Sequence, residues 1–187
     1  LAGFLHDIGK FSTWTIEENG RHRFIKHDDV GAKICVSLLK DLKFSKKQID
    51  YISFMIKNHI YPSSVLQSPD LNEKVMMRYV RKMESNVIDN IILAKADRLS
   101  ARGEAVTEKM VNENLNGLDK LLCFYMSIKD TLKPLPKLID GNEIMEILNI
   151  KPSPVLGKIL DALHEEQLNG NILTKDDAIS FIKNYIF

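Results

Sequence analysis

The residues of this sequence best suited to chemistry are a histidine and an aspartate that stand next to each other, His6 and Asp7. They end a short apolar run, residues 1–5, and are followed by Gly9 and Lys10. An imidazole and a carboxylate on consecutive residues can reach one cation from the same helix end. Imidazole suits zinc, iron or nickel, whereas carboxylate also suits magnesium and manganese. We expect Gly9 to take the left-handed conformation that often follows a helix end, which would leave the pair exposed.

Three later residues have side chains that could complete a metal site. His27 stands where a new helix should begin, His59 lies near the end of an apolar helical stretch, and Asp97 directly follows another one. The motifs around them are Phe-x-x-His-Asp-x-x-Gly-Ala at His27 and Ala-Lys-Ala-Asp-Arg-x-x-Ala-x-Gly at Asp97. The order of these residues and the motifs around them resemble those of the HD-domain metal-dependent phosphohydrolases. They are most similar to the HD region of bacterial tRNA nucleotidyltransferases, the CCA-adding group, and of the related poly(A) polymerases.

The resemblance implies a divalent metal ion, which could be Ni, Mn, Mg, Fe or Zn, held by His6, Asp7 and Asp97. Asp7 would bridge to a second ion if one binds. His27 and His59 would lie around the phosphate, either as ligands of that second ion or as hydrogen-bond donors and acids. HD domains carry another metal-binding histidine on an upstream helix, so the ligand set within this sequence is one histidine short.

Basic residues supply candidate contacts to a phosphate-bearing partner. Lys10 could reach a phosphate oxygen as a point charge, and Arg98 and Arg102 could line the same cleft or pair with acids outside it. A further group of cations falls on one side of a helix expected over residues 71–84, at spacings that make them neighbours. This group consists of Lys74, Arg78, Arg81 and Lys82. It could contact an RNA backbone, such as that of tRNA, although a solvated helix face is the simpler alternative.

Three functions agree with these residues. The first is a phosphohydrolase that acts on phosphate esters such as 2′,3′-cyclic nucleotides or RNA 3′ ends, with Asp7, Lys10, His27 and His59 as its catalytic residues. The second is a non-catalytic helical body that holds tRNA and keeps a relict site, and the third is a nucleotide phosphohydrolase. The sequence has no glycine-rich phosphate loop, so we do not expect nucleotide addition from these residues alone. It starts inside a helix without a methionine, and we expect it to be part of a longer protein.

Helical periodicity dominates, so we predict an all-α fold with no hairpin. An HD-domain bundle, truncated at its N-terminus, would occupy residues 1–133, and a small helical tail domain would occupy residues 134–187 after a proline-rich linker. Residues 9–26 are expected to form a loop. Helices are predicted over residues 28–40, 45–59, 71–84, 86–101, 107–131, 140–148, 154–170 and 174–185. Asp28 or Asp29 should cap the first of these helices, and Ser45, Thr107, Asp140 and Thr174 should cap later ones. Pro62 should stop the second helix, and Gly170 should end the seventh.

Composition is that of an ordinary globular domain. The 187 residues carry a net charge of +1. The charge is uneven, because residues 1–133 contain 21 Lys and Arg against 17 Asp and Glu, and residues 134–187 contain 5 against 8. A basic first part permits a phosphate-bearing partner. Cys35 and Cys123 are expected to be buried thiols in a reducing compartment. No apolar run could span a membrane, so we expect a cytoplasmic protein.

Overall fold

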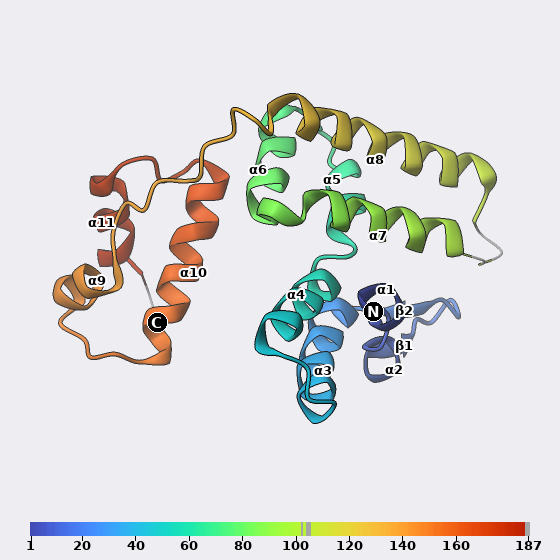
Figure 1. Ribbon diagram of the computed structural model, residues 1–187, viewed down its shortest axis with the longest axis horizontal. Helices are drawn as coiled ribbons and strands as arrows, with labels where there is room; N and C mark the ends of the chain where they lie inside the picture. Colours follow the sequence, from blue (N-terminus) through green and yellow to red (C-terminus); the bar gives the residue numbers. More distant parts are fainter. Residues whose placement is uncertain (102, 104–105, 186–187) are drawn as a thin grey trace. The chain divides into compact units, whose positions relative to one another are not determined.

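The computed structural model describes residues 1–101, 103 and 106–185 of the 187-residue chain. The prediction of an all-α fold is confirmed, with one short β-hairpin as the exception among the described residues. The chain divides into two compact units (Figure 1). The first consists of Leu1–Tyr79 and Met83–Lys129, and the second of Val80–Lys82 and Asp130–Phe187.

The first part of the chain does not form the predicted loop over residues 9–26. A one-turn helix, α1 (Ala2–Leu5), is followed by a second, α2 (Lys10–Thr13), and then by a hairpin of β1 (Trp14–Ile16) and β2 (His22–Phe24). The strands pair antiparallel, with Trp14 opposite Phe24 and Ile16 opposite His22. The strands are only three residues long, too short for their alternation to stand out in the sequence.

Two long helices form the core next to this segment. They are α3 (His27–Asp41) and α4 (Lys46–Lys57), which pack against each other and lie side by side in Figure 1. Their shared core is entirely apolar and consists of Leu5, Ala32, Cys35, Leu39, Ile49, Ile52 and Ile56. Leu5 of α1 belongs to this cluster, so burial of one leucine fixes the helix that leads into the His6–Asp7 pair. A fully buried leucine contributes about 1.5–3 kcal/mol.

The remainder of the first unit is helical. It contains α5 (Tyr61–Leu66), most of α6 (Glu73–Met83), the 3-10 turn η1 (Glu84–Asn86), α7 (Val87–Ser100) and α8 (Glu108–Ile128), whereas Val80–Lys82 of α6 belong to the second unit. Helices α7 and α8 pack as an antiparallel pair (Figure 1). The prediction that Pro62 stops a helix is wrong, because α4 already ends at Lys57 and Pro62 lies in the first turn of α5. A proline is accepted there because the first helical residues need no intrahelical N–H bond.

The predicted N-terminal caps of α4 and α8 are confirmed. Ser45 and Gln48 form a reciprocal capping box at the start of α4, and Thr107 accepts a hydrogen bond from the Met110 amide at the start of α8. The prediction for α3 was wrong, because that helix begins at His27, one residue before Asp28, and has no side-chain cap. The residue before it, Lys26, takes a left-handed backbone conformation with φ of 60°.

The second unit contains three helices around its own core. They are α9 (Gly141–Leu148), α10 (Pro154–Asn169) and α11 (Lys175–Lys183). Asp140 and Thr174 form capping boxes, and Gly170 ends α10 at φ of 75°, as predicted. Its buried core consists of Ile139, Ile144, Ile159, Leu163, Ile172, Ala178 and Ile182.

Two further predictions concern thiols and membrane spans. Cys35 is buried in the core of α3, as expected, but Cys123 is exposed on α8, which corrects the expectation that both thiols are buried. Among the described residues, no helix combines the length and the apolar character that crossing a bilayer requires.

Candidate metal centre

The five side chains predicted to meet do meet, and they come from four places in the first unit. His6 and Asp7 lie in the turn after α1, and His27 is the first residue of α3. His59 lies just after α4, and Asp97 lies in the last turn of α7. Tertiary packing thus joins positions 91 residues apart, since Nε2 of His6 lies 3.2 Å from Oδ1 of Asp97.

Gly9 sets how closely the His6–Asp7 turn approaches α3. Its backbone is right-handed, with φ of −76°, which corrects the prediction of a left-handed helix end. A Cβ atom on Gly9 would lie 2.1 Å from the carbonyl oxygen of His27 and 2.6 Å from the amide nitrogen of Gly31. The glycine is therefore required by close backbone packing, which the local sequence does not reveal.

His6, His27 and His59 are each held in one tautomer by a hydrogen bond between Nδ1 and a backbone carbonyl oxygen. Nδ1 of His6 lies 2.9 Å from the carbonyl oxygen of Gly3, and Nδ1 of His27 lies 2.8 Å from that of Phe24. Nδ1 of His59 lies 2.6 Å from the carbonyl oxygen of Ile56. A carbonyl oxygen only accepts hydrogen bonds, so each Nδ1 must carry a hydrogen. In the neutral form of each ring, Nε2 then keeps its lone pair.

These Nε2 atoms converge on the carboxylate of Asp7, which lies between two groups of donors. On one side, Oδ2 of Asp7 lies 3.3 Å from Nε2 of His6, which also contacts Asp97. On the other side, Oδ1 of Asp7 lies 3.5 Å from Nε2 of His27 and 3.9 Å from Nε2 of His59. The Nε2 atoms of His27 and His59 are themselves only 3.2 Å apart.

Lone pairs and carboxylate oxygens that face one another at these distances repel unless a cation or a proton lies between them. Ligand bonds of about 2.0–2.2 Å place neighbouring donors of one ion about 3–3.5 Å apart. Most of the observed separations fall near this range, and His6, Asp7 and His59 form a group whose ligand atoms all lie within 4.8 Å. The donor set therefore fits a divalent metal ion.

The ionisation of the site agrees with this view. The hydrogen bonds of His6 to Asp7 and Asp97 raise the pKa of His6 to about 10. Burial alone would raise the pKa of Asp7, but hydrogen bonds from His6 and Lys10 outweigh it and hold that pKa well below its usual range. The hydrogen bond from His6 likewise lowers the pKa of Asp97. Both carboxylates are thus ionised at neutral pH, and they attract positive charge.

His59 differs from the other two histidines in its burial. Its side chain is only 1% exposed. Burial lowers the pKa of His59, which keeps the ring neutral and its Nε2 free of a proton. A neutral imidazole is the form that binds a metal.

Of the three residues predicted to contact a phosphate near this site, only Lys10 is seen to contact one of its ligands among the described residues. Nζ of Lys10 lies 2.5 Å from Oδ2 of Asp7, inside the site. Arg98 follows Asp97 in α7 and is half-buried, and Arg102 lies outside the described residues.

The basic group on α6 is not a fully solvated face. Lys74 is exposed, whereas Arg78, Arg81 and Lys82 are half-buried. Nε of Arg81 is buried and has no hydrogen-bond partner among the described residues. Burial of this kind reduces what such a stripe could offer to an RNA backbone. The two remaining histidines, His22 in β2 and His164 in α10, are both exposed and lie outside this site.

Sequence reasoning missed the buried polar residues that hold His59 in place. Nδ2 of Asn90 donates to the carbonyl oxygen of Asn58 at 2.9 Å, and Tyr79 donates to Oδ1 of Asn90 at 3.0 Å. Tyr79 and Asn90 have no exposed surface. An asparagine within the apolar run of α7 was the available signal, because a buried amide needs partners.

The family comparison agrees with this geometry. The family model described as HD domain matches residues 1–102. The chain therefore belongs to the HD domain family.

Similarity to curated proteins extends over nearly the whole chain. The chain is 32% identical over 183 residues to the CC-adding tRNA nucleotidyltransferase of Thermus thermophilus. The matched region covers 97% of this chain and 38% of that protein. The chain is also 28% identical over 185 residues to the A-adding tRNA nucleotidyltransferase of Deinococcus radiodurans, covering 98% of this chain and 41% of that protein. The chain thus spans about two fifths of the length of these relatives, and the resemblance seen in its motifs is confirmed. No solved structure matches the chain.

Proposed function

We propose that the chain is a metal-dependent phosphohydrolase region that acts on phosphate esters such as 2′,3′-cyclic nucleotides or RNA 3′ ends. The observation that carries this proposal is the convergence of three histidine Nε2 atoms and the Asp97 carboxylate around the two oxygens of Asp7. We propose further that it belongs to a tRNA nucleotidyltransferase-type protein, with residues 1–133 as its HD domain and residues 134–187 as a tail domain.

The positions of the side chains support the following roles. His6, Asp7 and Asp97 would hold a divalent ion, and the second oxygen of Asp7 faces His27 and His59, where a second ion would fit. When bound, such an ion lowers the pKa of a water molecule from about 16 towards about 7 and offsets charge on a phosphoryl oxygen.

The chain itself would position the phosphate and move protons. Lys10 carries the positive charge closest to Asp7 and would neutralise a phosphate oxygen beside it. His27 is 13% exposed, more than His59, and its Nδ1 is anchored on a backbone carbonyl. When no second ion is bound, the protonated ring of His27 would give the hydrogen on Nε2 to a departing ribose oxygen.

The test is hydrolysis of 2′,3′-cyclic AMP in the presence of Ni²⁺, Mn²⁺ or Mg²⁺. We expect turnover that Asp7→Asn abolishes, because the amide keeps the shape of the carboxylate but removes its charge and one ligand oxygen. Asp50→Asn, at an exposed position of α4, is the matched control and should retain full activity. Release of phosphate from nucleoside triphosphates at a higher rate would favour the nucleotide phosphohydrolase instead.

The names of the relatives favour a second candidate, a helical body that contacts tRNA without cleaving phosphate. Lys74, Arg78 and Arg81 on α6 are the candidate contacts, with Arg98 and Arg102 as further ones. In that case no metal would support turnover, and tRNA binding would weaken steeply as salt is raised. Lys74→Gln should then reduce the salt dependence, since Lys74 is exposed.

A further inference from the structure

The hairpin that follows α2 presents an aromatic face that the candidate metal centre does not use. Residues directly opposite each other in an antiparallel pair share one face of the sheet. Trp14, Ile16, His22 and Phe24 therefore lie on one side of this hairpin, and Thr15 and Arg23 lie on the other. Trp14 is 52% exposed and Ile16 is 57% exposed.

This face is continuous with the metal centre through direct contacts. Nζ of Lys10, which lies 2.5 Å from Oδ2 of Asp7, is also 5.6 Å from the centre of the Phe24 ring. Phe24 is the cross-strand partner of Trp14, and its carbonyl oxygen anchors Nδ1 of His27. The carboxylate of Asp7 and the strand that carries Trp14 are thus linked through Lys10 and Phe24.

The indole ring of Trp14 is fixed in orientation and partly exposed. The rings of Trp14 and His22 stack at a centroid distance of 5.5 Å and an interplanar angle of 28°. Nε1 of Trp14 donates to Nδ1 of His22 at 2.9 Å, which fixes the rotation of the indole. His22 thus meets the edge of the indole that carries Nε1–H, and Trp14 remains 52% exposed, which leaves room for another flat group on the indole face.

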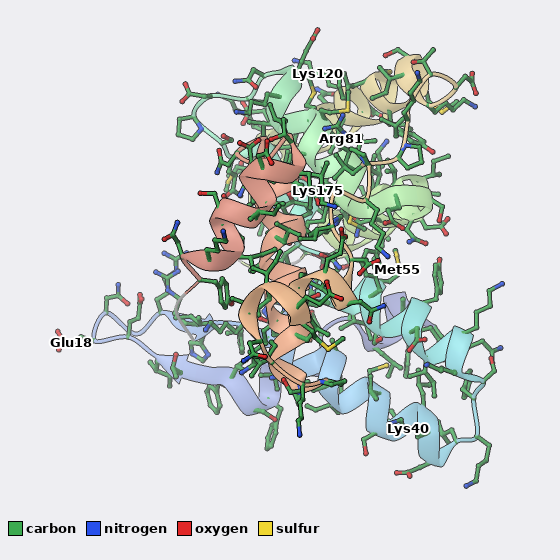
Figure 2. The ribbon with its side chains drawn as sticks, turned by 90° about the vertical axis from the view of Figure 1, so that its left-hand side faces the viewer. Glu18, Lys40, Met55, Arg81, Lys120 and Lys175 are labelled. Atoms are coloured by element: carbon green, nitrogen blue, oxygen red, sulfur yellow. The ribbon has the colours of Figure 1, made fainter. Side chains whose placement is uncertain are left out.

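The charges around the hairpin suit a phosphate-bearing occupant. Lys10 lies next to the ring of Phe24 on the aromatic face, whereas Arg23 lies on the opposite face. Glu17 is paired with Arg23 at 2.8 Å. Glu18 lies at the tip of the hairpin, far from the helices of the same unit (Figure 2).

We propose that the Trp14–Phe24 face is the base-binding subsite of this centre, and that Trp14 stacks on the nucleobase whose ribose phosphate lies beside Lys10. This rests on the proposed function and narrows its substrate to phosphate esters that carry a nucleobase. Base–aromatic stacking tolerates any base, because every base has a flat π face. The subsite therefore selects nucleotides over other phosphate esters without selecting a sequence.

Trp14 provides the assay, because it is the only tryptophan of the chain. Its fluorescence would be followed while 2′,3′-cyclic AMP, or a short oligoadenylate ending in a 2′,3′-cyclic phosphate, is added in the presence of a chelator. We expect saturable quenching by both, and no quenching by ribose 5-phosphate or inorganic phosphate. Tighter binding of the oligonucleotide would identify an RNA end as the source of the base, and equal binding would identify a free nucleotide.

Variants separate stacking from general damage. Calorimetry should show that Trp14→Leu weakens nucleotide binding by about tenfold, and that Trp14→Phe restores most of it. Thr15→Ala lies on the opposite face of the same strand and should bind as the unmodified chain does. Metal affinity should be the same in all three variants.

Because the fluorescence needs neither metal nor turnover, its failure can be told apart from failure of the proposed hydrolysis. Absence of quenching by either nucleotide, or equal quenching by ribose 5-phosphate, would overturn the subsite even if hydrolysis occurs. Fluorescence that changes with protein concentration rather than with nucleotide would assign the face to a second copy of the chain and would overturn it too.

Discussion

Replacement of Gly9 by alanine tests whether close packing of the His6–Asp7 turn on α3 builds the site. The added Cβ would lie 2.1 Å from the carbonyl oxygen of His27, 2.6 Å from the amide nitrogen of Gly31 and 3.0 Å from its Cα. All three are backbone atoms, so no side chain can rotate away. Atoms in normal contact lie about 3.5 Å apart, and the two segments must therefore separate by about 1 Å or more.

The consequences can be estimated from this separation. Overpacking of this kind costs about 1–3 kcal/mol, a substantial part of a stability of about 5–15 kcal/mol for a typical domain. The shift also pulls Asp7 away from His27, whose Nε2 now lies 3.5 Å from Oδ1. We expect Gly9→Ala to lower the urea midpoint of unfolding and to weaken binding of Ni²⁺ or Mn²⁺ by about tenfold or more, because a 1 Å error exceeds what ligand geometry tolerates.

Gly3→Ala, inside α1, is the matched control. Its Cβ would meet only the side chain of Leu93, at an ordinary 3.5 Å, and alanine favours a helix over glycine by about 0.8–1 kcal/mol. We expect the control to be as stable as the unmodified chain or slightly more so, with unchanged metal affinity. The reasoning is refuted if Gly9→Ala unfolds at the same urea concentration as Gly3→Ala and binds metal equally well.

Three further predictions concern the same unit. Because the pKa of His6 is raised to about 10, metal must displace its proton, and calorimetry between about pH 7 and pH 9 should show affinity rising by up to about tenfold per pH unit. Without metal, the stability of the chain should instead fall as pH rises. The proton on His6 stabilises the fold fully below pH 6.5 and is lost as pH rises towards 10, so the urea midpoint measured in a chelator should decrease over that range. Asn90→Leu leaves the carbonyl oxygen of Asn58 and the hydroxyl of Tyr79 without their present partner; we expect a loss of about 2–3 kcal/mol in chemical denaturation, and an unchanged midpoint would contradict the role of this network. Ser45→Ala removes a capping box and should cost about 1 kcal/mol in the same assay while leaving metal affinity unaltered; a loss of metal affinity would contradict the view that packing, and not this cap, positions His59.

What the sequence determined by itself is mostly local. Ser45, Thr107, Asp140 and Thr174 mark helix starts correctly, because a cap and the amides that it serves are within three residues of each other. The family could also be predicted from the sequence, because the short motifs around His6, His27 and Asp97 resemble those of HD domains.

The tertiary structure decided everything that depends on distant neighbours. Gly9 is required by the backbone of α3, and Asn90 by the carbonyl oxygen of Asn58. The hairpin of Trp14 and Phe24 forms from strands too short to show an alternating pattern. A linear sequence records which side chains exist, but the energy of packing and of burying polar groups depends on what they touch after folding, and that information appears only when the segments meet.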